Sequence, residues 1–141
     1  GHGDIEKLRS VRAAVGERII LINGMPSAET YAAAYLEAGM PSYSPGVIDF
    51  LPEVTWAFYR ALVEGDKGEA ERLMEGFYRP YTALRGLVSG YGISLVKAGS
   101  RIRGRPVGGV RPPLVDPTPE HKAALAALID RGLSLAQGDG P

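Results

Sequence analysis

The chain contains no cysteine among its 141 residues. Without thiols it can form neither disulfides nor cysteine-ligated metal sites, and it has no thiolate nucleophile. Excess charge of one sign is also missing, since 16 basic residues balance 16 acidic ones. This balance gives no electrostatic basis for binding nucleic acid or an acidic membrane surface, so we expect neither partner. The histidines are His2 and His121, which have no partner at metal-ligand spacing, so we also expect no metal.

Long apolar runs are absent too. No run reaches the roughly 18 to 20 residues that span a bilayer, and the amino end lacks the basic-then-apolar layout of a signal peptide. We therefore expect a soluble, cytoplasmic protein. The first residue is Gly1 rather than Met, so we also expect that the sequence starts within a longer protein or where a tag was removed.

The sequence does contain enough apolar material for one core, with 45% hydrophobic and 23% charged residues. The stretch around which the chain is organised begins with a run of branched apolar residues at 18–23. This run predicts a strand that is buried on both faces. The strand should end at Gly24 and Pro26, which cannot continue a ladder.

A helix and a second strand are predicted to follow. Ser27 is expected to cap a helix that runs to Leu36, and Gly39 offers a left-handed stop. A second strand is then expected within residues 41–48, parallel and adjacent to the first. In parallel β-α-β units the chemistry lies at the carboxyl ends of the strands. The residues at those ends are Asn23, Gly24, Met25, Tyr43 and Ser44.

Helical periodicity and capping signals predict further helices on both sides of this unit. Asp4 is the expected cap of the first helix, and Gly16 its stop. A helix that opens at Pro52 carries an apolar stripe wide enough to imply burial on more than one side. Pro80 is expected to end or kink a later helix. The predicted helices cover residues 4–15, 52–65, 69–81, 91–99 and 118–136, with a structured loop over 101–117.

Two parallel strands alone leave two open sheet edges. The first helix also has the position of a crossover from a preceding strand. The α/β pattern therefore predicts the closing part of a (βα)8 TIM barrel, with its last two parallel strands and their helices, followed by a C-terminal helical extension. In this division residues 1–66 form the partial barrel, roughly helix 6 to helix 8, and residues 67–141 form a three-helix extension.

Several segments carry a resemblance to a known family: GDIEKLRSVRAAVG, NGMPSAETYAAAYLEAG, YSPGVIDFLPEVTWAFYRALVEGD, GYGISLVKAGSRI and VRPPLVDPTPE. In this order and spacing they resemble the carboxyl half of the dihydrodipicolinate synthase and N-acetylneuraminate lyase superfamily, over essentially the whole chain. VKAG followed by VRPPL is shared broadly in that superfamily. GMP-SAE after the first strand and the YS pair on the second resemble its 5-dehydro-4-deoxyglucarate dehydratase branch.

The resemblance implies a lyase of the Schiff-base type that needs no cofactor. A lysine would condense with the ketone of a small keto sugar acid, 5-dehydro-4-deoxyglucarate, and loss of water and carbon dioxide would give 2,5-dioxopentanoate. In the family the lysine lies in a Lys-Asp-Gly-x-Gly-Asp stretch, of which this chain matches only Gly1, Gly3 and Asp4. The lysine is therefore expected just upstream of Gly1. We expect no catalytic residue in this chain, no activity from the chain alone, and a homo-oligomer as the full-length protein.

The resemblance assigns substrate binding to Gly24 and Met25, whose backbone would line the pocket, and to Ser44 near the imine. Plainer alternatives stay open, since Ser44 can be a strand residue bonded to backbone and Gly24 part of an ordinary loop. The wall of the second strand departs from the family pattern, which usually shows small residues and an asparagine. The departing residues are Pro45, Gly46 and Asp49.

Other candidates favour structural roles. Lys97 is the only lysine in an apolar setting, where desolvation could make it nucleophilic, but it falls in the helical extension. A stretch with Arg101, Arg103, Arg105 and Arg111 lacks interleaved aromatics, so we expect a solvated or subunit-facing loop. Two other functions stay open: another aldolase or lyase of the superfamily, and a non-catalytic half-barrel that pairs with another chain.

Overall fold

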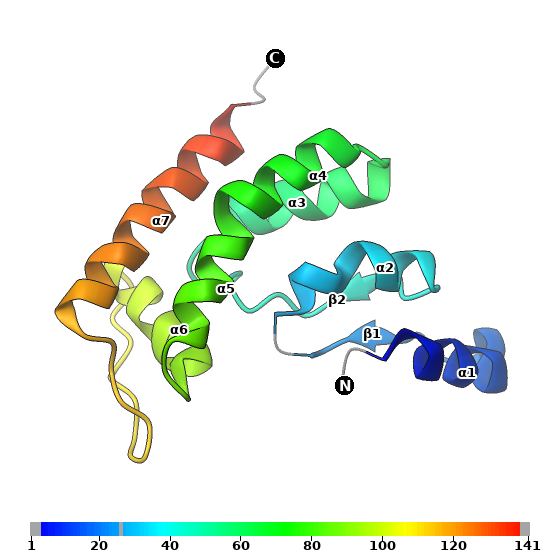
Figure 1. The fold of residues 1–141 in the computed structure, drawn as a ribbon, viewed down its shortest axis with the longest axis horizontal. Coiled ribbons are helices and arrows are strands. Elements are labelled where there is room, and N and C mark those ends of the chain that lie inside the picture. The colour runs from blue at the N-terminus through cyan, green and yellow to red at the C-terminus, as the bar shows by residue number, and fades with distance from the viewer. Residues whose placement is uncertain (1–3, 26, 139–141) are drawn as a thin grey trace. The chain divides into compact units, whose positions relative to one another are not determined.

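The computed structural model describes residues 4–25 and 27–138 of the chain. The chain divides into two compact units, Gly1–Gly46 and Val47–Pro141. Among the described residues, two short strands belong to the first unit, and the second unit is helical (Figure 1). The expected division at residue 66 concerns which elements belong to a barrel, and it stays a prediction.

The first unit opens with helix α1, Ile5–Val15. Asp4 caps it, because the Asp4 carboxylate accepts a hydrogen bond from Lys7 N at 3.0 Å. Gly16 ends the helix with a φ of 55°, a value that favours glycine. Both predicted signals are therefore confirmed, and a 3₁₀ turn, Gly16–Arg18, leads toward the sheet.

Strand β1, Ile22–Asn23, pairs in parallel with strand β2, Ser42–Tyr43. In this register Ile22 lies opposite Ser42 and Asn23 opposite Tyr43. The predicted pair of adjacent parallel strands is thus confirmed. Both strands are shorter than predicted, since Arg18 lies in the 3₁₀ turn and residues 46–50 form turns.

A 3₁₀ turn, Ala28–Tyr31, and helix α2, Ala32–Glu37, connect the two strands. The expected N-cap at Ser27 is wrong. Ser27 has a φ of 55°, and its carbonyl, rather than a capping hydroxyl, accepts hydrogen bonds from Thr30 N and Thr30 Oγ1 at 3.1 and 2.8 Å. These bonds tighten the first turn, so the α-helical part begins only at Ala32. The predicted stop at Gly39 is confirmed by a φ of 86°.

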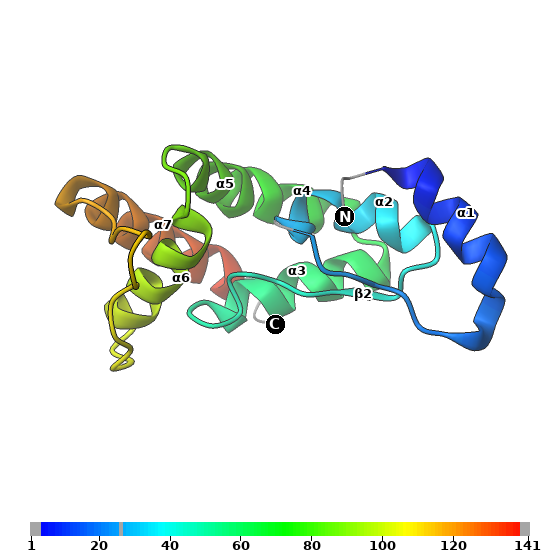
Figure 2. The same ribbon diagram turned by 90° about the horizontal axis from the view of Figure 1, so that it is seen from below.

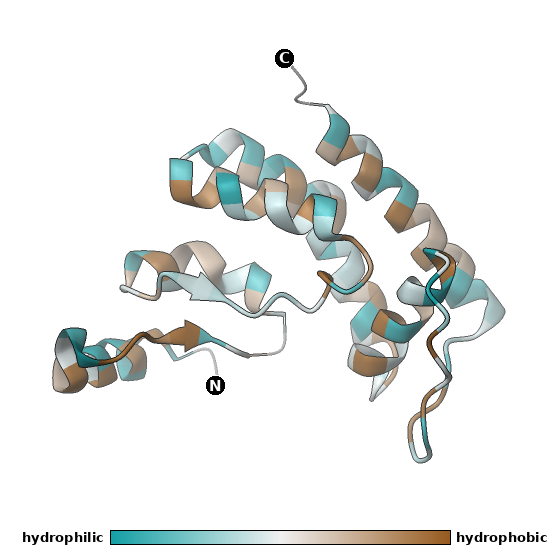
Figure 3. Cartoon of the chain, turned by 180° about the vertical axis from the view of Figure 1, so that it is seen from behind, coloured by the Kyte–Doolittle hydropathy of each residue, from teal (hydrophilic) through white to brown (hydrophobic). Residues whose placement is uncertain are grey.

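The core of the first unit lies between α1, α2 and the strands, where Leu8, Tyr35 and Met40 cluster. The predicted burial of the first strand on both faces is wrong. Ile20 is 77% exposed and Ile22 57%, and Figure 3 shows this apolar segment in brown. The reason is that a two-stranded sheet leaves β1 with one unpaired edge, and no described element covers these side chains.

The second unit packs its helices around α7, Pro119–Gln137, which contacts α3, α5 and α6 (Figures 1 and 2). The other helices are α3 (Pro52–Glu64), α4 (Lys67–Leu73), α5 (Arg79–Gly86) and α6 (Tyr91–Ile102). More than five helices were thus found, as expected. Within residues 4–25 and 27–138, no helix is both long and apolar enough to cross a membrane.

One apolar core holds the second unit together. Its largest fully buried side chains are Val47, Phe50, Leu51, Val54, Phe58, Leu73, Phe77, Tyr78, Tyr91, Leu95, Leu125 and Ile129. Helix α3 contributes only one face to it, because Trp56 is 62% exposed and Val63 50%. The expected burial of α3 on more than one side is therefore wrong for this chain.

Pro80 does not end its helix. A π-helical turn, Met74–Tyr78, joins α4 to α5, and Arg79 N donates to Met74 O. Because Pro80 has no N–H and its ring would clash with the carbonyl four residues earlier, a wider turn directly before it lets the helix continue. Of the expected end or kink at Pro80, the end is wrong, and the π turn is the distortion that the helix carries instead.

The start of α7 follows the sequence closely. Thr118 Oγ1 accepts from His121 N at 3.3 Å, and Pro119 occupies the first turn. Hydrogen bonds from its own backbone and from Thr118 lower the pKa of Glu120. The predicted cap is confirmed.

Gly99 allows α6 to approach Phe50. A Cβ added at Gly99 would lie 2.6 Å from Cγ of this fully buried ring. We expect Gly99→Ala to lower the free energy of unfolding by about 1 to 3 kcal/mol, because overpacking exceeds the gain of about 1 kcal/mol in helix propensity. Urea denaturation followed by circular dichroism measures this. Gly86→Ala is the matched control, since its Cβ would meet nothing within 4 Å; a Gly99→Ala variant as stable as this control would contradict the packing.

Candidate functional site

The carboxyl ends of β1 and β2 lie next to each other. Ser44 N donates to Asn23 O at 2.8 Å, a bond that belongs to the parallel pair of Asn23 with Tyr43. Gly24 and Ser44 are therefore the next residues in register at the same edge of the sheet. This placement is what a site at the strand ends requires.

Asn23 organises the turn that leaves β1. Its side chain is 3% exposed; Oδ1 accepts from Met25 N at 3.1 Å and Nδ2 donates to Ala28 O at 3.5 Å. The Met25 N–H is therefore occupied by the chain itself. Of the Met25 backbone, only the carbonyl is left for the expected lining role. The sequence drew attention to Asn23 by its position alone, and the closing of the turn by its side chain was missed.

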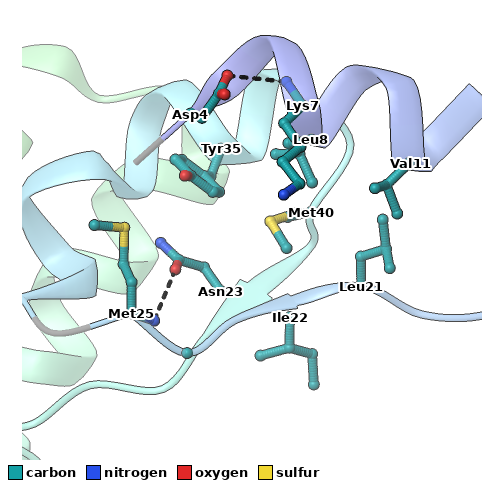
Figure 4. A pocket seen from close by; sticks show the side chains of 11 residues that line it. Asp4, Lys7, Leu8, Val11, Leu21, Ile22, Asn23, Met25, Tyr35 and Met40 are labelled. Carbon is teal, nitrogen blue, oxygen red and sulfur yellow. Dashed lines mark hydrogen bonds between the residues drawn. The ribbon is translucent and has the colours of Figure 1, made fainter. Parts of the chain in front are cut away.

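A cavity of about 600 Å³ lies between α1 and the exit of β1. Its lining residues are Asp4, Lys7, Leu8, Val11, Leu21, Ile22, Asn23, Gly24, Met25, Tyr35 and Met40 (Figure 4). The structure thus brings the predicted residues Gly24 and Met25 together in one cavity. Ser44 is not among the described residues that line this cavity. It is exposed and directly follows β2.

Gly24 has open space around it. A Cβ added there would meet nothing within 4 Å, so the folded chain gives no steric reason for a glycine at this position. Glycine without an internal reason can mark a place where another molecule approaches the backbone closely.

Lys7 is the cation at this cavity, and the sequence interpretation missed it. The Lys7 side chain runs from α1 toward Met40 (Figure 4). Asp4, Lys7, Leu8 and Val11 follow the spacing i, i+3, i+4 and i+7 of one helix face. That spacing could have revealed the lysine on the apolar side.

Lys97 and the basic loop have structural contacts in the second unit. Lys97 Nζ donates to Gly109 O at 2.7 Å, and Arg101 donates to Gly108 O at 3.0 Å. Arg101 also pairs with Asp116 at 2.8 Å. These contacts fasten the loop that follows α6 to the helix itself, and they fit the structural role expected for Lys97.

No metal centre is visible in the part of the chain that the structure describes, where no three His, Cys, Asp or Glu side chains gather. His121 Nδ1 lies 2.8 Å from the hydroxyl of Tyr91, a contact within the helical unit. His2 lies outside the described residues.

The sequence model that describes the dihydrodipicolinate synthetase family matches residues 1–131 of this chain. The chain belongs to this family. It is 45% identical over 141 residues to a protein of Streptomyces avermitilis named "Probable 5-dehydro-4-deoxyglucarate dehydratase 1", with 97% of this chain and 45% of the relative covered. A Rhizobium rhizogenes protein, "Probable 5-dehydro-4-deoxyglucarate dehydratase", is 42% identical, with 92% and 43% covered. The resemblance to this branch is confirmed, and the chain spans less than half the length of these relatives.

Solved structures support the fold. A dihydrodipicolinate synthase from Oceanobacillus iheyensis matches with a TM-score of 0.78 at 24% identity, covering 93% of this chain and 44% of that one. A dihydrodipicolinate synthase from Bacillus clausii matches with a TM-score of 0.76. The chain therefore shares the fold of part of a dihydrodipicolinate synthase. That β1 and β2 are the last two strands of a (βα)8 barrel stays a prediction.

Asn23 offers a test of how the cavity is built. Asn23→Ala removes the acceptor for Met25 N, so we expect the first unit to lose about 1 to 3 kcal/mol of unfolding free energy, the usual cost of an unpaired polar group. Hydrogen exchange of the α1 and α2 amides measures this. Ser10→Ala, which removes an exposed hydroxyl on α1, is the control and should change stability by less than about 0.5 kcal/mol. Equal effects of the two substitutions would mean that Asn23 does not organise the turn.

Proposed function

We propose that this chain carries part of the substrate site of a Schiff-base lyase that dehydrates and decarboxylates 5-dehydro-4-deoxy-D-glucarate to 2,5-dioxopentanoate. The observation that carries the proposal is the 45% identity to a relative named for this dehydratase. The adjacent strand ends support it, since they present Gly24 and Ser44 at one edge. The substrate is a small keto sugar acid.

In this proposal the chain's residues bind and orient, and the nucleophile comes from elsewhere. The imine-forming lysine is supplied by a preceding segment of the full-length protein, and no cofactor takes part. Gly24 lets the substrate approach the backbone, because nothing in the chain fills the space beside it. The Ser44 hydroxyl lies near the imine and donates a hydrogen bond to a substrate oxygen on which negative charge develops.

A second function has a specific observation in its favour. Ile19, Ile20 and Ile22 are 51%, 77% and 57% exposed beside the unpaired edge of β1. An apolar strand edge is a template for pairing with another strand. A non-catalytic half-barrel that pairs with another chain through this edge would use the same surface. Another aldolase or lyase reaction of the superfamily is the remaining alternative.

Ser44 can be tested in a hybrid in which this chain follows the preceding residues of the Streptomyces avermitilis relative. Ser44→Ala should lower kcat at least about tenfold, since a transition-state hydrogen bond is worth about 1.4 kcal/mol. It should leave stability within about 0.5 kcal/mol, because Ser44 is exposed. Ser42→Ala, two residues earlier and within β2, is the control. Unchanged turnover in Ser44→Ala would remove Ser44 from the site.

The chain alone should show no imine formation. Its lysines are Lys7, Lys67, Lys97 and Lys122. Imine chemistry needs a neutral amine held about 3 to 3.5 Å from the ketone. Lys97 Nζ is instead engaged by Gly109 O. Borohydride trapping with 5-dehydro-4-deoxy-D-glucarate, read by mass spectrometry, should give no adduct on the 141-residue chain.

The hybrid supplies the positive arm of this experiment. It should trap an adduct upstream of the present Gly1, and Lys7→Arg in the hybrid should trap equally well. An adduct on Lys7 or Lys97 of the isolated chain would overturn the expectation that the lysine lies upstream. A folded hybrid that traps nothing would overturn the Schiff-base mechanism.

A further inference from the structure

Residues 44–46 follow β2 and have two backbone N–H groups, and both of these donate hydrogen bonds within the chain. Ser44 N donates to Asn23 O at 2.8 Å. Pro45 has no N–H to donate. Gly46 N donates to the carboxylate of Glu29, Oε1, at 2.9 Å. The two acceptors therefore lie at the end of β1 and in the 3₁₀ turn that follows it.

Glu29 is an unusual place for a carboxylate. It lies in the 3₁₀ turn Ala28–Tyr31, and only 5% of the residue is exposed. Burying a carboxylate costs free energy unless hydrogen bonds compensate for the lost water. The bond to Gly46 spans 17 residues and connects the exits of the two strands. A buried carboxyl group at this position thus joins the parts of the chain that carry Gly24 and Ser44.

Gly46 contributes its N–H to this contact rather than its small size. A Cβ added at Gly46 would meet nothing within 4 Å, so the fold does not require glycine there. Pro45 and Gly46 are also positions where the chain departs from the pattern expected for the family. Since Pro45 removes one possible anchor beside Ser44, the Glu29 carboxylate provides the next one along the chain.

We propose that Glu29 is a positioning residue, whose buried carboxylate holds Ser44 in place at the end of β2 through the Gly46 N–H. Asn23 plays the corresponding part at the end of β1, where it holds Met25 N. The role of Glu29 in catalysis rests on the proposed function of Ser44. The hydrogen bond to Gly46 does not depend on that function, so the two can be tested separately.

Amide exchange of the 141-residue chain, followed by NMR, tests the hydrogen bond. In Glu29→Leu the Gly46 amide should exchange at least about tenfold faster, because an acceptor of charge-assisted strength is lost. Glu29→Gln keeps an acceptor oxygen and should stay within about threefold of the unchanged chain. Glu37→Gln, an exposed glutamate at the end of α2, is the control and should leave Gly46 unchanged.

Two outcomes of this measurement overturn the inference. One is unchanged exchange of Gly46 in Glu29→Leu. The other concerns Glu29→Asp, which keeps the charge but shortens the side chain by one methylene, and which replaces Glu29→Leu if that variant does not fold. Gly46 exchange in Glu29→Asp should be as fast as expected for Glu29→Leu, and a protected amide there would overturn the inference.

The hybrid with the Streptomyces avermitilis relative tests the consequence for catalysis. Glu29→Asp should lower kcat about as much as Ser44→Ala, with little change in KM, and Glu29→Gln should restore most of it. The double variant Glu29→Asp, Ser44→Ala should be no slower than Ser44→Ala alone, because positioning matters only while the hydroxyl is present. A loss that adds to that of Ser44→Ala would show a general structural role and overturn the inference while the proposed function stands. An inactive, folded hybrid whose Gly46 amide still responds to Glu29 would overturn the proposed function, and the catalytic role of Glu29 with it.

Discussion

The parallel pairing of β1 with β2 is the constraint on which the site depends. It brings the exit of one strand beside the exit of the other, although the two are separated by α2 in the sequence. Two buried polar side chains then fix what the pairing has brought together. Asn23 closes the turn around Gly24, and Glu29 reaches across to Gly46. Because the strands are only two residues long, these side-chain bonds carry much of the order at the strand ends.

The contacts found in the helical unit are structural. Its helices pack around α7. Lys97 and Arg101 of α6 donate hydrogen bonds to backbone carbonyls of the loop that follows, and these bonds hold the loop against the helix. The lysine of the VKAG segment therefore has a complete structural explanation in its contacts. The cavity at the exit of β1 lies in the first unit.

The chain belongs to the dihydrodipicolinate synthetase family and spans less than half the length of its relatives. It also leaves apolar side chains at β1 exposed. Isoleucines at positions 19, 20 and 22 are the residues a buried strand needs, and here they face solvent. Burial of apolar surface is worth about 25 cal/mol per Å², so these side chains favour any element that covers them. Their exposure is the observation that favours the pairing proposal.

The sequence by itself determined the local features. Asp4, Gly16, Gly39 and Thr118 act as predicted, because a cap or a left-handed stop involves only residues a few positions away. The strand pair was predictable from the alternation of apolar runs and helices. Only the tertiary structure decided the rest: the π turn before Pro80, the exposure of the first strand, and the hydrogen bond from Gly46 to Glu29. Such features depend on which distant groups meet, and hydrogen-bond partners 17 residues apart leave no periodic signal in a single sequence.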